Sequence, residues 1–495
     1  MANYIKINPL DNVIIALKDF SNGELIDLEG SQLKVLNDVP RGHKIAVTNI
    51  AEGQDIIKYG APIGHATAAI LPGEYVHVHN TKTNLSGTIS YEFSQKLNQL
   101  AFANQSLTFK GYKRSSGEVG IRNELWIVPT VGCVNGQAEQ IINLFKEQND
   151  TRDIDSIHVF KHAYGCSQLG DDHTNTQKAL AQLIKHPNAG GVLVLGLGCE
   201  NNQIDHLKKF IGQYDSARIK FLVAQDVEDE VEEGLKLFQE IYEQMRHDKR
   251  EEVPFSSLKV GLKCGGSDGL SGITANPLVG MFSDFLVAQG GSTILTEVPE
   301  MFGAEHLLME RSESRKVFNK TVDMINGFKE YYLKHDLPVY ENPSPGNKKG
   351  GITTLEDKSL GCTQKGGVAT VTDVLAYAEP IKKNGLNLLC APGNDLVAAS
   401  ALGFSGCQIV LFTTGRGTPF GSFVPTMKIS TNTPLSIKKS NWIDFNAGRI
   451  VEDQTIEETL AHFIAELKNV AEGKKLKHEL SGFKEIAIFK TGITL

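Results

Sequence analysis

Three cysteines recur at an even spacing in the middle of the chain. Cys133, Cys166 and Cys199 each follow a glycine at the end of an apolar run, and 33 residues separate each from the next. One βαβ unit takes about 30 residues, so this period predicts equivalent positions at the ends of successive parallel strands. Ligands bind at that edge of an open parallel sheet, and thiolates are good ligands for iron and zinc. The spacing therefore predicts a metal or redox-sensitive site.

Residues beside these cysteines are suited to acid–base chemistry or further ligation. His162 stands four residues before Cys166, and Glu200 directly follows Cys199. We expect His162 to be the leading acid or base and Glu200 an alternative base or ligand. Cys264 repeats the pattern after a later apolar run, which makes it a fourth candidate ligand from across a domain boundary. Such thiols suit either a mononuclear iron ion or a four-iron cluster that binds substrate.

Several polar segments are suited to holding an acidic substrate. The glycine-rich segment 264–277 follows an apolar run, and its backbone N–H groups suit an anion. A long segment at 341–362, which we expect to be irregular, supplies cations, as does FTTGRGTPFG, which does not match the GxGxxG dinucleotide loop. The predicted substrate-binding residues are Ser267, Asp268 and Asn347, and the predicted carboxylate holders are Lys348, Lys349 and Arg416.

The elements that must position these residues fall into four parts. Residues 1–92 alternate short apolar stretches with turn residues, which predicts a small β domain. Residues 93–117 are polar and predict a linker. Residues 118–252 and 253–495 alternate apolar runs with helical patterns, which predicts two α/β domains with parallel sheets.

The β domain carries its own polar residues. Arg41, His43 and Lys44 stand in the motif RGHK, and we expect them to close over an anionic substrate as a lid. Lys58 and Tyr59 of IIKYG also stand out there.

Composition limits the classes of partner. The 495 residues include 50 Lys and Arg against 58 Asp and Glu, a formal charge of −8, which argues against nucleic acid or an anionic membrane as the main partner. The sequence shows neither an apolar run of about 18 residues nor a signal-peptide pattern, so we expect a cytoplasmic protein. Seven cysteines are too few for a disulfide scaffold and are expected to be thiols.

Long, non-periodic motifs give a more specific indication. The chain resembles the altronate/galactarate dehydratase family in RGHK, IIKYGAPIG, NELWIVPTVGCVNG, YGCSQLGDDH, GLGCENNQ, CGGSDGLSGITANP, TEVPEMFGAE, ENPSPGNKKGGITTLEDKSLGCTQK and TTGRGTPFG. The resemblance implies an N-terminal β-clip (SAF-like) domain, a Rossmann-like C-terminal part and a homodimer. It also implies a need for Fe(II), with Mn(II) as a possible substitute, and for reducing conditions.

The motifs favour the altronate branch of that family. The resemblance then implies a hydro-lyase that converts D-altronate to 2-dehydro-3-deoxy-D-gluconate in hexuronate breakdown. Galactarate dehydration and sulfolactate desulfonation are alternatives within the family. An NAD-dependent oxidoreductase is a weaker alternative because a complete GxGxxG motif is missing. A sugar-acid sensor without catalytic activity is the non-enzymatic alternative.

Overall fold

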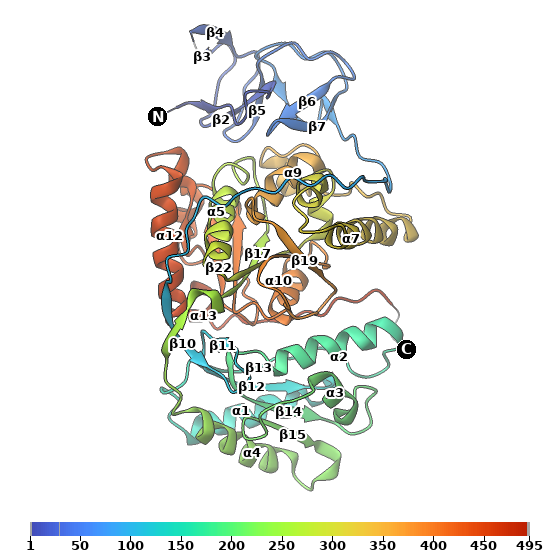
Figure 1. The fold of residues 1–495 in the computed structure, drawn as a ribbon, viewed down its shortest axis with the longest axis vertical. Helices are drawn as coiled ribbons and strands as arrows, with labels where there is room; N and C mark the ends of the chain where they lie inside the picture. The colour runs from blue at the N-terminus through green and yellow to red at the C-terminus, as the bar shows by residue number, and fades with distance from the viewer. Residues whose placement is uncertain (1, 29, 493–495) are drawn as a thin grey trace.

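Three domains lie in a row in the computed structural model, which describes residues 2–28 and 30–492. The N-terminal domain forms one end, the C-terminal domain the centre and the middle domain of the sequence the other end (Figure 1). The chain must therefore pass the C-terminal domain before it builds the middle one. None of the helices in the described part of the chain is long and apolar enough to cross a membrane.

The N-terminal domain consists of short strands, as predicted. Its sheets have the orders β1-β2-β5-β8, β6-β7-β9 and β3-β4, and their pairs are antiparallel. The strands are β1 (Tyr4–Ile5), β2 (Val13–Ala16), β3 (Leu25–Leu28), β4 (Ser31–Lys34), β5 (Lys44–Ala46), β6 (Asp55–Lys58), β7 (Ala61–Ala66), β8 (Tyr75–Val76) and β9 (Thr81–Lys82).

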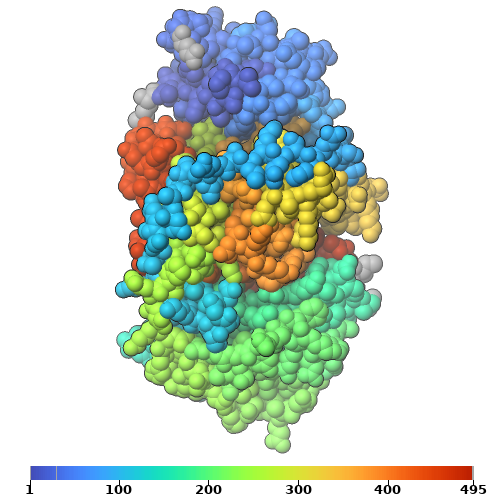
Figure 2. Space-filling model, in the orientation of Figure 1, coloured from blue at the N-terminus to red at the C-terminus, as the bar shows by residue number. Residues whose placement is uncertain are grey.

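The segment that follows β9 lies on the surface of the C-terminal domain (Figures 1 and 2). Specific contacts hold it there: the Tyr91 hydroxyl donates to Glu305 at 2.5 Å, and the Gln95 amide donates to the Ser312 carbonyl at 2.9 Å. The predicted linker 93–117 also includes a strand. This strand, β10 (Thr108–Lys113), pairs with β11 (Val119–Gly120) and β16 (Glu251–Pro254).

The middle domain has a parallel sheet of order β13-β12-β14-β15. Its strands are β12 (Glu124–Pro129), β13 (Ser156–Val159), β14 (Ala189–Gly196) and β15 (Ile219–Val223). Its helices are α1 (Asn135–Gln148), α2 (Gly170–Ile184), α3 (Ile204–Ile211) and α4 (Glu230–Met245). The prediction of alternating strands and helices with a parallel sheet is confirmed.

The C-terminal domain has a seven-stranded parallel sheet of order β19-β20-β18-β17-β21-β22-β23. Its strands are β17 (Lys259–Cys264), β18 (Ser292–Leu295), β19 (Val371–Leu375), β20 (Gly385–Leu389), β21 (Ile409–Thr414), β22 (Thr426–Ser430) and β23 (Phe445–Asn446). Its helices include α5 (Ala275–Ala288), α6 (Glu305–Met309), α7 (Arg315–Lys334), α10 (Asp395–Phe404), α11 (Thr433–Lys438), α12 (Ile456–Ala471) and α13 (Lys477–Leu480).

The segment 341–362 differs from its prediction. Instead of remaining irregular, it forms α8 (Pro345–Lys349) and α9 (Leu355–Cys362). Each helix begins at a hydroxyl cap: the Ser344 side chain accepts from the Asn347 N–H, and the Thr354 side chain accepts from the Asp357 N–H. These caps satisfy backbone donors that are otherwise unpaired at helix starts. Helix α9 ends beside the carboxyl end of β17, where the Sγ atoms of Cys362 and Cys264 lie 3.3 Å apart.

Candidate active site

A cluster of charged and sulfur-bearing side chains is buried at the carboxyl edge of the seven-stranded sheet. We call it the lysine–thiol cluster. None of its members is more than 7% exposed, and they come from the ends of β17 and β18, from α9 and from the turn after α9. Its members are Lys263, Cys264, Glu297, Glu300, Lys358, Cys362 and Lys365.

Cys264 is at the centre of this cluster. Its Sγ lies 3.3 Å from the Sγ of Cys362, 3.0 Å from Oε2 of Glu300 and 2.8 Å from Nζ of Lys365. Among the described residues, Cys264, Glu300 and Cys362 form the one group of three donors within 4.8 Å of one another that could hold a metal ion. Two soft thiols and one carboxylate are a donor set suited to iron or zinc.

Lysines compensate the negative charge of the cluster. Lys358 lies 2.7 Å from Glu300, while Lys263 pairs with Glu297 and lies 2.9 Å from Asp395. Burial opposes ionisation of Glu300, but the three neighbouring lysines outweigh it and lower the pKa of this carboxyl to about 2. The glutamate is therefore ionised and the lysine beside it is an ammonium group.

One residue at the edge of this cluster, Glu297, has a strained backbone conformation. Glu297 has a φ of +69° although it is not glycine. Residues held in this left-handed region concentrate at functional sites, where the surrounding contacts maintain them. Here the Cys264 backbone N–H donates to Glu297 at 2.9 Å and fixes the carboxylate against the strand end.

The N-terminal domain covers the cluster through a second buried charge group. Lys44 and Lys58 donate to opposite oxygens of Asp357 at 2.8 and 2.9 Å, and Lys44 also donates to the Gly351 carbonyl at 2.7 Å. Burial lowers the pKa of Lys44 to about 8, although Asp357 opposes this shift. The predicted substrate residue Lys44 thus forms hydrogen bonds that join the N-terminal domain to the C-terminal domain.

The glycine-rich loop after β17 lies at the point where the strand order reverses. The loops after β17 and β21 flank this point, which is the usual ligand position in such sheets. Ser267 is 1% exposed and its Oγ is buried without a hydrogen-bond partner. Asp268 accepts from Thr431 at 2.9 Å and from Asn432 at 3.1 Å, so it braces the loop.

The remaining predicted binding residues surround this loop. Asn347 is buried and donates to the Ser267 carbonyl at 2.8 Å, so it positions the loop. Arg416 is exposed beside α8, with Nη1 3.5 Å from the Gly346 carbonyl. Lys348 is half-buried and Lys349 is exposed on the same helix. The structure therefore brings these sequence-predicted cations to the outside of the site.

Two residues of the predicted lid have partners of their own. The guanidinium of Arg41 lies 3.3 Å from Glu452 of the C-terminal domain. His43 is buried with its Nδ1 2.5 Å from the Tyr75 hydroxyl, and burial lowers its pKa to about 4. Both residues lie at the boundary between the domains, where a lid would have to close.

The three evenly spaced cysteines lie elsewhere, in the middle domain. Cys133, Cys166 and Cys199 follow the adjacent strands β12, β13 and β14 and are all exposed. Cys133 and Cys166 line an open groove of about 610 Å³. The three thiols do not all lie within 4.8 Å of one another, and the structure gives Cys264 other partners than these three. The strand placement is as predicted, but Cys264 does not complete the set.

His162 and Glu200, the predicted acid or base candidates, are both hydrogen-bonded to nearby groups. The Nε2 of His162 donates to the Pro129 carbonyl at 2.8 Å while its Nδ1 accepts the Tyr164 N–H at 3.1 Å. Burial also lowers the pKa of this imidazole. Glu200 accepts from the Thr130 hydroxyl at 2.6 Å and from two backbone N–H groups of its own turn. Both side chains therefore hydrogen-bond to the backbone of their own turns, although His162 also lines the groove of Cys133 and Cys166 and Glu200 lines a neighbouring pocket.

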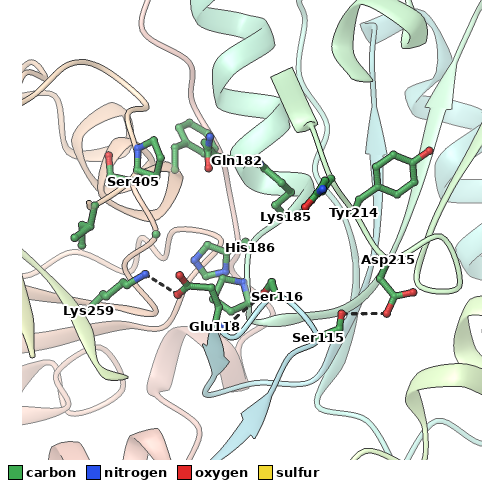
Figure 3. Close-up of a pocket in the computed structure, with 16 residues that line it drawn as sticks. Ser115, Ser116, Glu118, Gln182, Lys185, His186, Tyr214, Asp215, Lys259 and Ser405 are labelled. Carbon is green, nitrogen blue, oxygen red and sulfur yellow. Dashed lines mark hydrogen bonds and ion pairs between the residues drawn. The ribbon is translucent and has the colours of Figure 1, made fainter. Parts of the chain in front are cut away.

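A separate pocket of about 650 Å³ lies between the middle and C-terminal domains (Figure 3). Lys259 pairs with Glu118 across it at 2.6 Å, and Ser115 donates to Asp215 at 3.2 Å. Lys259 begins β17, so this pocket is at the amino edge of the large sheet. It contains none of the sequence-predicted site residues.

Sequence reasoning did not propose Lys263, Asp357, Cys362 or Lys365 as site residues. The available signal for Lys263 was its place directly before the cysteine in GLKCGG, one strand before the acidic residues of TEVPE, which sequence reasoning did consider as a ligand or base. The two motifs meet because β17 and β18 are adjacent parallel strands, which end at the same edge of the sheet.

Comparisons with known proteins agree with this architecture. Three family models match in order: the altronate/galactarate dehydratase SAF domain over residues 2–84, the D-galactarate dehydratase/altronate hydrolase second domain over 111–246, and the D-galactarate/altronate dehydratase C-terminal domain over 255–494.

Curated relatives match over nearly the whole chain. An altronate dehydratase of Bacillus subtilis (strain 168) is 59% identical over 497 residues, covering 100% of both chains. One from Escherichia coli (strain K12) is 54% identical over 99% of this chain and 100% of its own. The galactarate dehydratase (L-threo-forming) of E. coli is 32% identical over 96% of this chain and 94% of its own. This chain belongs to the altronate/galactarate dehydratase family.

Proposed function

We propose that this protein is a hydro-lyase that converts D-altronate to 2-dehydro-3-deoxy-D-gluconate. One observation carries the choice of substrate: relatives at 59% and 54% identity over their full lengths are altronate dehydratases, whereas the galactarate dehydratase is 32% identical. The predicted alternatives of galactarate and sulfolactate are the nearest competing substrates.

The chemistry of this reaction matches the charges of the site. The proton beside a carboxylate is very weakly acidic, so its removal requires stabilisation of an enediolate. Lys358 is a buried ammonium group whose side chain lines a small cavity between the N-terminal and C-terminal domains. Neighbouring carboxylate and thiol groups keep its pKa above the ordinary value although burial opposes this. It therefore offers a positive charge to an oxyanion in a poorly solvated site.

Other residues would bind the acid group of the substrate. The Ser267 Oγ is buried at the same cavity and has a free hydrogen-bonding capacity. Arg416 and Lys348, at the outside of the site, would attract the anion toward it. Asn347 and Asp268 would act indirectly by holding the loop that carries Ser267.

Iron is proposed as the metal, with Cys264, Glu300 and Cys362 as its ligands. Their donor atoms already converge within 4.8 Å, and the lysines around them would balance the charge of two thiolates. The ion would supply a Lewis acid for carboxylate and hydroxyl oxygens. An iron–sulfur cluster on Cys133, Cys166 and Cys199 is the second candidate, since these exposed thiols follow three adjacent strands.

A direct assay tests the proposed function. The purified protein, kept anaerobic with Fe(II) and a thiol reductant, is offered D-altronate, galactarate and sulfolactate in parallel. We expect formation of a 2-keto acid from D-altronate with the highest kcat/KM. A higher kcat/KM with either other acid would reassign the substrate, and binding without turnover would favour a sensor.

We also propose that the protein is a cytoplasmic homodimer. The family resemblance and the composition support this proposal. Light scattering of the purified protein measures the mass, and a value for one chain of 54.1 kDa would contradict the dimer.

A further inference from the structure

Tyr59 occupies a turn position where its residue type is unexpected. It stands with Gly60 between β6 and β7, and the two residues have φ values of +62° and +74°. A two-residue hairpin turn with both φ values positive favours Asn-Gly, and a bulky aromatic residue is rarely found there. The conformation is strained, which is typical of a side chain held in place for a function.

The phenol of Tyr59 inserts into the C-terminal domain. Its hydroxyl fits a slot between two glycines, where a Cβ on Gly272 would collide with it and one on Gly361 would lie 3.3 Å from it. Gly272 belongs to the loop after β17, and Gly361 belongs to α9. The N-terminal domain thus delivers one hydroxyl to the edge that carries the lysine–thiol cluster.

The slot opens on the cavity proposed above as part of the active site. Tyr59 lines this cavity together with Ser267, Lys358 and Cys362. The buried Ser267 Oγ, which has no partner, is an independent sign that a polar ligand belongs there. The cavity volume of about 10 Å³ leaves room for about one water molecule. The sugar acid must therefore enter before the hairpin β6–β7 is fully seated.

We propose that Tyr59 is a catalytic residue, the general acid that protonates the departing C3 hydroxyl of the substrate. The inference rests on the proposed dehydration. In the step, the electron pair of the enediolate forms the C2–C3 double bond and the C3–O bond breaks. The Tyr59 O–H bond breaks as its proton joins the departing oxygen, which leaves as water. The phenolate then regains a proton from solvent when the hairpin opens.

The surroundings of the phenol suit this role. Burial raises the pKa of Tyr59 to about 12, with Lys58 opposing the shift, so the hydroxyl keeps its proton at neutral pH. The ammonium group of Lys58 lies 4.6 Å from the centroid of the Tyr59 ring. Asp357 holds that ammonium group at 2.9 Å, so the cation is in place to stabilise the phenolate after proton transfer.

The test compares Tyr59→Phe with Tyr4→Phe in the full-length, iron-loaded protein. Tyr4 is a matched control because it lies in the same domain and its hydroxyl donates to the Asp27 carbonyl at 3.0 Å. Three rates are measured: 2-keto acid formation from D-altronate, deuterium uptake at C2 of recovered substrate in D₂O, and fluoride release from 3-deoxy-3-fluoro-D-altronate. Fluoride needs no protonation to leave.

For Tyr59→Phe we expect 2-keto acid formation to fall by roughly 10²–10⁴-fold. Deuterium uptake at C2 and fluoride release should remain within a few-fold of wild type, because only the leaving-group proton is missing. Tyr4→Phe should resemble wild type in all three rates.

Several results would overturn the assignment. Equal loss of all three rates in Tyr59→Phe would show that Tyr59 has only a structural role. A normal rate of 2-keto acid formation would show that Tyr59 takes no part in the reaction. Failure of the wild-type protein to dehydrate D-altronate would overturn the proposed function and this inference together. Wild-type turnover without the expected pattern in Tyr59→Phe overturns the role of Tyr59 alone.

Discussion

The ammonium group of Lys44 lies 2.8 Å from the carboxylate of Asp357, and both side chains are almost completely buried. These two residues are 313 positions apart in the sequence and belong to different domains. Asp357 also receives Lys58, so one carboxylate compensates two cations. The attachment of the N-terminal domain to the active-site helix α9 therefore depends strongly on a single side chain.

Asp357→Asn should destabilise the folded protein by about 3–5 kcal/mol, because two buried ammonium groups would lose their anionic partner. Chemical denaturation measures the change in free energy of unfolding. The control is Asp453→Asn, which removes a half-exposed partner of Arg449 and should leave the free energy of unfolding close to that of wild type. Equal effects of the two substitutions would show that the buried carboxylate has no special role in docking.

Stability should fall as the pH is lowered from 7 toward 5. Burial lowers the pKa of both His186 and His478 to about 3. An unfolded histidine titrates near 6.5, so below that pH the unfolded chain binds protons that the folded chain excludes. Each histidine should contribute up to about 1.4 kcal/mol per pH unit in this window.

Urea midpoints at pH 7, 6 and 5 measure this dependence. In His478→Gln the urea midpoint should change less with pH than in wild type, although the variant is less stable at each of the three pH values. The reason for that lower stability is that His478 accepts the Thr426 N–H at 2.8 Å and donates to the Phe483 carbonyl at 2.8 Å. An unchanged pH dependence of the midpoint would exclude a contribution from this imidazole.

The fold was largely predictable because its repeats are local. The period of 33 residues correctly indicated βαβ units, and β12, β13 and β14 are adjacent in the sheet. Helix α9 was missed for a physical reason: all eight of its residues are buried, including Glu356, Asp357 and Lys358. A helix whose polar residues are also buried shows no alternation between an apolar and a polar face.

The site was only partly predictable. The sequence placed Cys264 at a strand end, but its contact with Cys362 joins residues 98 positions apart. The prediction instead grouped Cys264 with three regularly spaced thiols. Regular spacing indicates equivalent positions in one sheet, here the sheet of the middle domain. The contact between Cys264 and Cys362 instead depends on how α9 packs against the seven-stranded sheet. Long-range packing of this kind leaves no periodic signal in the sequence.

The proposed metal ligands can be separated by substitution. Cys264→Ser and Cys362→Ser should each lose most of the iron retained after anaerobic reconstitution, because serine keeps the size of the residue but not its soft donor. Cys390→Ser is the control, since this thiol packs against the hydrophobic core outside the group of donors. Iron and acid-labile sulfide are measured on each variant.

The alternative site gives a different pattern in the same experiment. If Cys133→Ser, Cys166→Ser and Cys199→Ser lose iron and sulfide while Cys264→Ser keeps both, the metal belongs to the middle domain. Iron retention by all six variants would leave none of these thiols as a required ligand.

His162→Gln should lower stability while leaving turnover within a few-fold of wild type. Both ring nitrogens of His162 are bonded to backbone groups, at 2.8 Å to the Pro129 carbonyl and 3.1 Å to the Tyr164 N–H. Leaving such buried groups unpaired costs about 1–3 kcal/mol. The exposed His247 provides a matched control, and His247→Gln should change the free energy of unfolding by less than about 0.5 kcal/mol. If turnover instead falls by about 10²-fold or more without loss of stability, His162 is restored as the acid or base that the sequence predicted.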